Sequence, residues 1–133
     1  MRLHQIILIG LAVAGCASAA DPVERGKYLV TEVAKCQDCH TPRTADGSPD
    51  QAKWLKGTTL DFAPIHEIPT WHKTSPDLTG SSPLFKRWGD KGLTTFLMTG
   101  KNPRGHEADP PMPAYHLSQE DADAIVAYLK SLP

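Results

Sequence analysis

The sequence of 133 residues contains no hydrophobic run long enough to cross a membrane. The apolar stretch from Ile6 to Val13 is well short of the roughly 20 residues that a membrane-spanning helix needs. The sequence also has no internal repeat, heptad pattern or low-complexity tract, which excludes a repeat protein or a coiled coil. With 40% hydrophobic and 22% charged residues, it has the composition of one ordinary soluble globular domain.

The chain has no large excess of either charge. Residues 21–133 carry 13 basic and 15 acidic side chains, so no nucleic acid or other polyanion is expected as a partner. The charges are nevertheless segregated, with six bases and two acids from Lys73 to Arg104, and five acids and no base from Glu107 to Asp123. The simplest interpretation is two solvated faces. The alternative is that the basic stretch docks an acidic partner.

Residues 1–20 have the layout of a secretory signal peptide. Arg2 precedes the apolar stretch, and Ala17-Ser18-Ala19 forms a cleavage site with small residues at both ends. We therefore expect a periplasmic, exported protein whose mature domain is residues 21–133.

An alternative interpretation concerns Cys16. The stretch Val13-Ala14-Gly15-Cys16 resembles a lipoprotein box, which would leave Cys16 lipidated and the exported protein anchored to a membrane. We favour simple cleavage, because the first helix signal begins at Asp21 and leaves almost no tether for an anchored domain.

The mature chain predicts an all-α domain with a helix at each end. Asp21 is an N-cap candidate with Pro22 at the first helical position. The apolar face of this first helix comprises Gly26, Leu29, Val30 and Val33. Glycine is unfavourable inside a helix, so Gly26 predicts that the last helix comes close there. The last helix begins after Ser118, and its apolar stripe comprises Ala122, Ile125, Val126, Leu129 and Leu132, with Tyr128 beside it.

The middle of the chain predicts loops and one further helix. That helix covers Asp90 to Thr99 and ends at Gly100. Residues 41–84 contain prolines and glycines spread too evenly for regular elements, so we expect loops with one short strand pair around Trp54 to Phe62. Loops of this length need a further group to pack around, because they form few regular elements of their own.

Cys36-Gln37-Asp38-Cys39-His40 is the motif that carries chemistry. C-x-x-C-H is the attachment site of c-type haem, in which two thiols bind the porphyrin and the adjacent histidine is placed to ligate the iron. Three other interpretations are weaker. A thioredoxin-like dithiol needs a β-α-β context, a zinc site needs a second ligand pair, and a structural disulfide gives no role to His40.

The second axial ligand is predicted from the methionines. Met112 lies in Pro110-Pro111-Met112-Pro113, a loop stiffened by prolines on both sides, whereas Met98 falls within a helix where core packing explains it. We favour Met112 over a histidine. The competing histidines are His66, His72, His106 and His116, of which His116 is near Met112 in sequence. The tryptophans Trp54, Trp71 and Trp88 are expected to pack in the core or at the haem, where one indole N–H could bond a propionate.

These motifs resemble class I cytochromes c over residues 21–133. The resemblance implies a fold in which the N- and C-terminal helices cross at Gly26, near Ile125 and Tyr128, and long loops enclose one covalent haem. It implies that Cys36 and Cys39 anchor the haem, and that His40 and Met112 bind its iron. A closer likeness, to mono-haem cytochrome c domains of bacterial periplasmic or membrane-bound dehydrogenases, rests on the stretches Arg25–Leu29, Cys39–Arg43, Thr74–Asp77 and Pro110–Pro113.

The expected function is therefore electron transfer without catalysis. The carrier would accept electrons from a dehydrogenase and donate them to a terminal oxidase or another cytochrome. One alternative is a haem protein with an open or weakly ligated iron, acting in ligand binding or peroxidase chemistry. A thiol oxidoreductase is a third interpretation.

Overall fold

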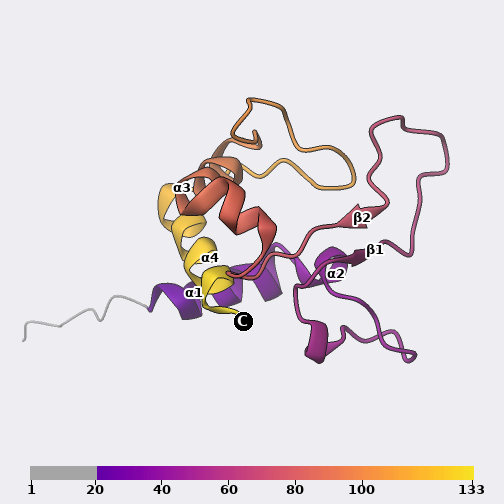
Figure 1. Cartoon of the computed structure of the whole chain (residues 1–133), viewed down its shortest axis with the longest axis horizontal. Helices are drawn as coiled ribbons and strands as arrows, with labels where there is room; N and C mark the ends of the chain where they lie inside the picture. The colour runs from indigo at the N-terminus through magenta and orange to yellow at the C-terminus, as the bar shows by residue number, and fades with distance from the viewer. Residues whose placement is uncertain (1–20) are drawn as a thin grey trace, which may run out of the picture.

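Figure 1 shows the computed structural model of the chain, which describes residues 21–133. The predicted signal peptide and Cys16 lie outside these residues. The helices are α1 (Pro22–Tyr28), α2 (Gln37–His40), α3 (Pro83–Thr99) and α4 (Gln119–Ser131). Two short strands, β1 (Thr58–Thr59) and β2 (Thr74–Ser75), pair antiparallel. None of the helices within residues 21–133 is long and apolar enough to cross a membrane.

The first helix begins as the sequence predicts. The Asp21 side chain accepts a hydrogen bond from the Val23 N–H at 2.9 Å, and Pro22 occupies the first turn. After α1 the helix widens into a π-helical turn, Leu29–Val33, in which the Ala34 N–H donates to the Leu29 carbonyl at 2.8 Å.

This π-helical turn overturns part of the predicted apolar face. Leu29 and Val30 are buried, but Val33 is 57% exposed. The wider turn moves residue 33 away from the direction that a 3.6-residue period gives it. The prediction that Val33 continues the buried face is therefore wrong.

The predicted close approach of the last helix at Gly26 is present. A Cβ atom at Gly26 would overlap the Ala124 carbonyl and lie 2.8 Å from the Tyr128 Cβ, so α1 and α4 pack backbone to backbone there. Beside this contact, the Arg25 guanidinium bonds the Asp121 carboxylate at 2.9 and 3.1 Å. Only a residue without a side chain permits this packing.

The middle of the chain has two helical segments where the sequence predicts one. α3 begins at Pro83, and the Ser82 hydroxyl caps it by accepting from the Phe85 N–H at 3.2 Å. Gly89, with a non-helical φ of 63°, divides α3, so the segment that follows is the predicted helix and the segment before Gly89 is additional. Gly100, with φ 69°, ends it as predicted.

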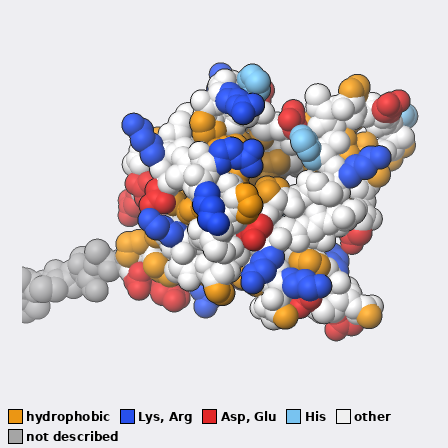
Figure 2. Space-filling model, in the orientation of Figure 1, with side chains coloured by type: hydrophobic (Ala, Val, Ile, Leu, Met, Phe, Trp, Pro, Cys, Tyr) orange, Lys and Arg blue, Asp and Glu red, His pale blue; other side chains and the backbone are white. Residues whose placement is uncertain are grey.

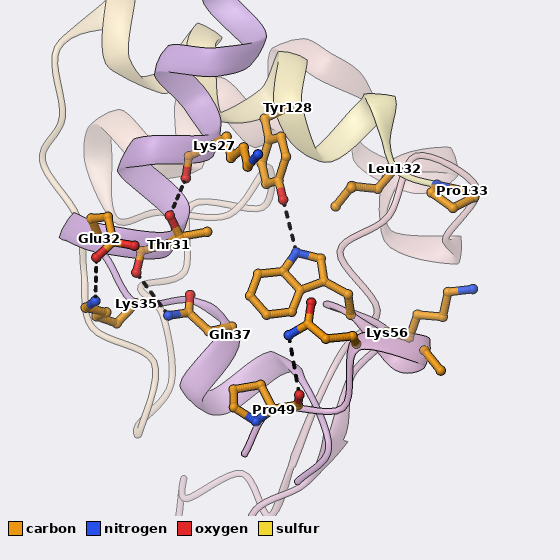
Figure 3. A pocket seen from close by; sticks show the side chains of 13 residues that line it. Lys27, Thr31, Glu32, Lys35, Gln37, Pro49, Lys56, Tyr128, Leu132 and Pro133 are labelled. Carbon is orange, nitrogen blue, oxygen red and sulfur yellow. Dashed lines mark hydrogen bonds and ion pairs between the residues drawn. The ribbon is translucent and has the colours of Figure 1, made fainter. Parts of the chain in front are cut away.

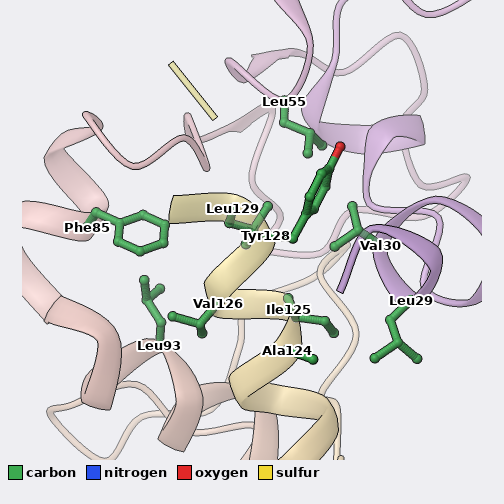
Figure 4. Packing of buried hydrophobic residues seen from close by; sticks show 10 residues of the cluster. All are labelled: Leu29, Val30, Leu55, Phe85, Leu93, Ala124, Ile125, Val126, Tyr128 and Leu129. Carbon is green, nitrogen blue, oxygen red and sulfur yellow. The ribbon is translucent and has the colours of Figure 1, made fainter. Parts of the chain in front are cut away.

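The core lies along α4, which packs against α1 and against α3. Ser118 caps α4 through the Asp121 N–H at 3.2 Å, as predicted. Leu132 lies just beyond the helix and is half-buried. Figure 4 shows the buried cluster, which comprises Leu29, Val30, Leu55, Phe85, Leu93, Ala124, Ile125, Val126, Tyr128 and Leu129.

Residues 41–82 are mostly loops, as expected, but the strand pairing differs from the prediction. β1 falls within the predicted range, whereas its partner β2 lies well beyond it at Thr74–Ser75. Residues 60–73 form a loop that projects from this strand pair (Figure 1). Within residues 41–82, the regular elements are thus the two-residue strands and the 3₁₀ turn at Gln51–Lys53.

Replacing Gly26 with alanine should destabilise the protein by about 1–3 kcal/mol or more, because the added Cβ forces α1 away from α4. Helix propensity alone would make alanine more stable than glycine here by about 1 kcal/mol, so a loss of stability reports the contact with α4. Denaturant unfolding measures the change. Lys27→Ala, in the same helix but exposed, is the control and should stay within about 0.5 kcal/mol. An unchanged or more stable Gly26→Ala would contradict this packing.

Candidate functional site

The C-x-x-C-H residues are brought together on α2. Cys36 caps the short helix, and Cys39 and His40 lie on its single turn, with both cysteines present as free thiols. A positive φ of 52° at Lys35 turns the chain from the first helical segment into this one. The Cys36 N–H then donates to the Val30 carbonyl at 3.0 Å, which fixes the motif against the π-helical turn.

His40 is held in one orientation. Its imidazole is only 6% exposed, and its Nδ1 lies 2.9 Å from the Pro76 carbonyl oxygen. A carbonyl only accepts hydrogen bonds, so Nδ1 carries the proton and Nε2 keeps its lone pair. Burial lowers the pKa of His40, and the bond to Pro76 opposes only part of that shift. The ring is therefore a neutral imidazole with Nε2 available, the form that binds a metal.

The two thiols lie in surroundings that disfavour their ionised form. Burial raises the pKa of Cys36 to about 11, and burial followed by the charge of Asp38 raises the pKa of Cys39. A thiol oxidoreductase requires the opposite, a lowered pKa that makes the thiolate available. These thiols therefore do not support the thiol oxidoreductase interpretation.

Met112 is half-buried in the loop between α3 and α4. Its N–H donates to the Asp109 carbonyl at 3.2 Å. His72 fastens this loop to the segment before β2, because its N–H donates to the Pro110 carbonyl at 2.8 Å and its Nε2 lies 3.2 Å from an Asp109 carboxylate oxygen.

Tyr115 fastens the same loop to the chain just before the C-x-x-C-H motif. Its hydroxyl donates to the Ala34 carbonyl at 3.1 Å, two residues before Cys36. Burial, together with the nearby thiols of Cys36 and Cys39, raises the pKa of Tyr115 to about 12. The hydroxyl therefore stays protonated and can donate. The loop that contains Met112 is thus tied to the chain on both sides of the motif.

The competing ligand candidates differ in burial. All four competing histidines, His66, His72, His106 and His116, are exposed. Met98 is half-buried within α3, as Met112 is within its loop. Within residues 21–133, no group of three or more His, Cys, Asp or Glu side chains is placed to hold a metal ion, so a zinc site has no ligand set there.

The tryptophans have different environments. The Trp54 indole N–H donates to the Tyr128 hydroxyl at 3.0 Å, and the Trp88 ring packs on Phe96 with centroids 5.3 Å apart. The Trp71 Nε1 is buried and has no hydrogen-bond partner. Leaving a buried donor unpaired costs about 1–3 kcal/mol. The unpaired N–H therefore indicates that a bound group outside the polypeptide supplies its acceptor.

The residues present fit a covalently bound haem. Two free thiols can form the thioethers, His40 Nε2 can bind the iron, and the Trp71 N–H can donate to a propionate. The sequence indicates the motif but not the role of Pro76 or the choice of Trp71. The Pro76 acceptor is a backbone atom, which leaves no sequence pattern.

A cavity of about 690 Å³ lies beside α2 (Figure 3). Gln37, Trp54, Tyr128 and several lysines line it, but none of the four predicted site residues does. The Gln37 amide donates to the Thr31 carbonyl at 3.0 Å, while its Oε1 is buried without a partner. This cavity is therefore separate from the residues that would hold a haem.

Comparison with known proteins agrees with this chemistry. The model of the cytochrome c family matches residues 23–133. The fructose dehydrogenase cytochrome subunit of Gluconobacter japonicus is 34% identical over 85% of this chain and 22% of its own length. The cytochrome c subunit of the quinone alcohol dehydrogenase of Gluconobacter oxydans is 35% identical over 87% and 25%, and that of the gluconate 2-dehydrogenase of Pantoea cypripedii is 35% identical over 87% and 27%. The chain thus spans less than a third of each relative.

Trp71→Phe should lower the unfolding free energy of the haem-containing protein by about 1.5–3 kcal/mol, the usual worth of a hydrogen bond to a charged group. Thermal unfolding measures this change. Trp88→Phe is the control, because it makes the ring smaller by the same amount without removing a buried, unpaired donor. Equal losses in the two variants would show that the Trp71 N–H has no charged acceptor.

Proposed function

Because the chain belongs to the cytochrome c family, we propose that it is a single-haem electron carrier that takes electrons from a dehydrogenase and passes them to a terminal oxidase or another cytochrome. The observation that carries the proposal is the fixed, neutral His40 beside two free thiols. The family binds haem c, whose iron supplies a reversible one-electron couple when bound.

Each predicted site residue has a distinct task in this proposal. Cys36 and Cys39 would hold the haem covalently, and His40 would bind the iron through Nε2. Met112 would be the second protein ligand of the iron, which would keep the coordination unchanged between oxidation states and exclude other ligands. The proline-flanked loop, tied down through Asp109 and Tyr115, supports this role for Met112.

The arrangement of elements supports a haem enclosed by loops. We propose that α1 and α4 cross at Gly26, and that residues 41–82 and the loop between α3 and α4 surround the haem. Gly26 gives the close contact that such a crossing needs. Half-buried or buried apolar side chains along α3, such as Leu93 and Leu97, supply further packing.

We propose that the protein is exported to the periplasm by removal of residues 1–20, with lipidation of Cys16 as the alternative form of processing. The secretory layout of that segment supports export. The matching relatives include cytochrome subunits of fructose, alcohol and gluconate dehydrogenases, which supports a dehydrogenase as the electron donor.

A basic surface supports docking to an acidic redox partner. The six bases from Lys73 to Arg104 are all exposed, and none of them forms an ion pair within residues 21–133. Figure 2 shows Lys and Arg side chains over α3 on this face. Unpaired exposed charges of one sign favour encounter with a surface of the opposite sign. We propose that these six side chains, Lys73, Lys86, Arg87, Lys91, Lys101 and Arg104, together form the basic surface that meets the partner.

The alternative is an open-iron haem protein for ligand binding or peroxidase chemistry. It shares the thioethers and the His40 ligand but leaves the sixth position vacant. The two functions therefore differ in whether Met112 binds the iron.

Covalent attachment is tested by extraction. The denatured wild-type protein should keep its haem through acid-acetone treatment, at one haem per chain, because thioether bonds survive unfolding. Cys36→Ala with Cys39→Ala should release it. Haem released from the wild type, or a second haem per chain, would contradict the proposal.

Met112→Ala should open the sixth position to water, lower the reduction potential and let the reduced protein bind carbon monoxide, with the covalent haem retained. The measurement is the long-wavelength sulfur-to-iron absorption band of the oxidised protein, which this variant should lose.

Met98→Ala is the matched control and should keep the band. Because Met98 is half-buried, Met98→Ala should lower the unfolding free energy by less than the cost of about 2–5 kcal/mol for replacing a fully buried methionine with alanine. A band that survives Met112→Ala would disprove the assignment. A wild type that binds carbon monoxide readily would favour the open-iron alternative.

Electron transfer to an acidic partner should slow as salt rises, because exposed charges are screened beyond about 8 Å at physiological ionic strength. Lys86→Gln with Lys91→Gln should reduce the rate at low salt and flatten the salt dependence. Lys27→Gln, on α1 and outside the basic surface, should change neither. Stopped-flow kinetics measures the rate. A wild-type rate that does not change with salt concentration would show that these lysines are only a solvated face.

A further inference from the structure

Residues 55–57, which follow the 3₁₀ turn, are hydrogen-bonded to both segments that meet at the His40 ring, namely the motif and the segment that contains Pro76. The Gly57 N–H donates to the His40 carbonyl at 2.8 Å, and the Leu55 N–H donates to the buried Thr41 hydroxyl at 2.9 Å. On the other side, the Leu78 N–H donates to the Leu55 carbonyl at 2.9 Å. We call residues 55–57 the latch, because they are bonded both to the motif and to the segment that contains Pro76.

The backbone of the latch is held in an unusual conformation. Leu55 has φ 56° although it is not glycine, and Gly57 has φ 78°. Leu55 is also completely buried. A residue with a side chain adopts this region only when its surroundings impose it, and such strain is concentrated at functional sites. Leu55 is bonded in this conformation through both its N–H and its carbonyl.

Gly57 lies directly against the backbone that holds the histidine. A Cβ atom at position 57 would lie 2.6 Å from the Ser75 carbonyl oxygen, 2.8 Å from the Pro76 carbonyl carbon and 2.9 Å from the Asp77 nitrogen. All three are backbone atoms, which cannot swing aside as a flexible side chain can. The Pro76 carbonyl carbon carries the oxygen that accepts the bond from His40 Nδ1.

We propose that Gly57 is a positioning residue that sets the distance between the Pro76 carbonyl and His40 Nδ1, and so tunes the imidazole that binds the iron. The inference rests on the proposed role of His40 as a haem ligand. A carbonyl that accepts the Nδ1 proton makes the ring a stronger electron donor through Nε2. A stronger donor stabilises the oxidised iron, so a displaced carbonyl raises the reduction potential.

The test compares Gly57→Ala with Gly47→Ala in the haem-containing protein. Gly47 has φ 85°, and nothing lies within 4 Å of a Cβ placed there. Both substitutions therefore force alanine into a positive φ, but only Gly57→Ala displaces the Pro76 carbonyl. Gly57→Ala should raise the reduction potential, and the His40 Nδ1–H should exchange with solvent about tenfold faster in reduced-state NMR, the factor that one hydrogen bond contributes. Gly47→Ala should match the wild type in both measurements.

A second pair of variants covers the case in which Gly57→Ala does not fold. Thr41→Val removes the acceptor for the Leu55 N–H and should change both measurements in the same direction. Thr41→Ser keeps the hydroxyl and should restore wild-type values.

The proposal is overturned if Gly57→Ala equals Gly47→Ala in both measurements, or, where Gly57→Ala does not fold, if Thr41→Val equals the wild type. Failure of the proposed function is distinguishable, because it would appear as a wild type without covalent haem. In that protein the Nδ1–H exchange of His40 still tests Gly57, since the measurement does not require iron.

Discussion

The hydrogen bond between His40 Nδ1 and the Pro76 carbonyl is the interaction on which the site depends. It joins residues 36 positions apart and decides which ring nitrogen is free. The β1–β2 pair brings residue 75 to residue 58, and so delivers Pro76 to the histidine. The long loop between the motif and Pro76 therefore places the Pro76 carbonyl beside the His40 ring. The motif alone would leave this ring free to rotate.

The helices supply the rigid frame for this loop chemistry. α1 and α4 meet at Gly26, and α3 is joined to α4 by the Thr94 hydroxyl, which donates to Asp123 at 2.9 Å, and by the Lys130–Asp90 ion pair at 2.6 Å. The predicted ligands lie on short or irregular segments that this frame fixes from both sides. Rigid helices with functional loops are a common division of labour.

Local signals made much of the fold predictable, and contacts between distant residues account for the rest. Asp21 and Ser118 act as caps because their side chains reach neighbouring N–H groups. Val33 was misplaced because periodicity assumes an α-helix where the chain forms a π-helical turn. The helix from Asp90 to Thr99 is confirmed, because Gly89 is non-helical and divides α3 there, whereas the segment over residues 83–88 is not predicted, although Ser82 before Pro83 is a recognisable start signal. For the site, the motif identifies His40, but neither the Pro76 carbonyl nor the unpaired Trp71 N–H has a sequence pattern, since both depend on tertiary packing.

The measurement that tests the central claim most directly is NMR of the reduced protein with ¹⁵N-labelled histidine. The account predicts that His40 Nδ1 carries a proton protected from solvent and that Nε2 carries none and has the shift of an iron ligand. A protonated Nε2, or a His40 ring that exchanges freely with solvent, would contradict it.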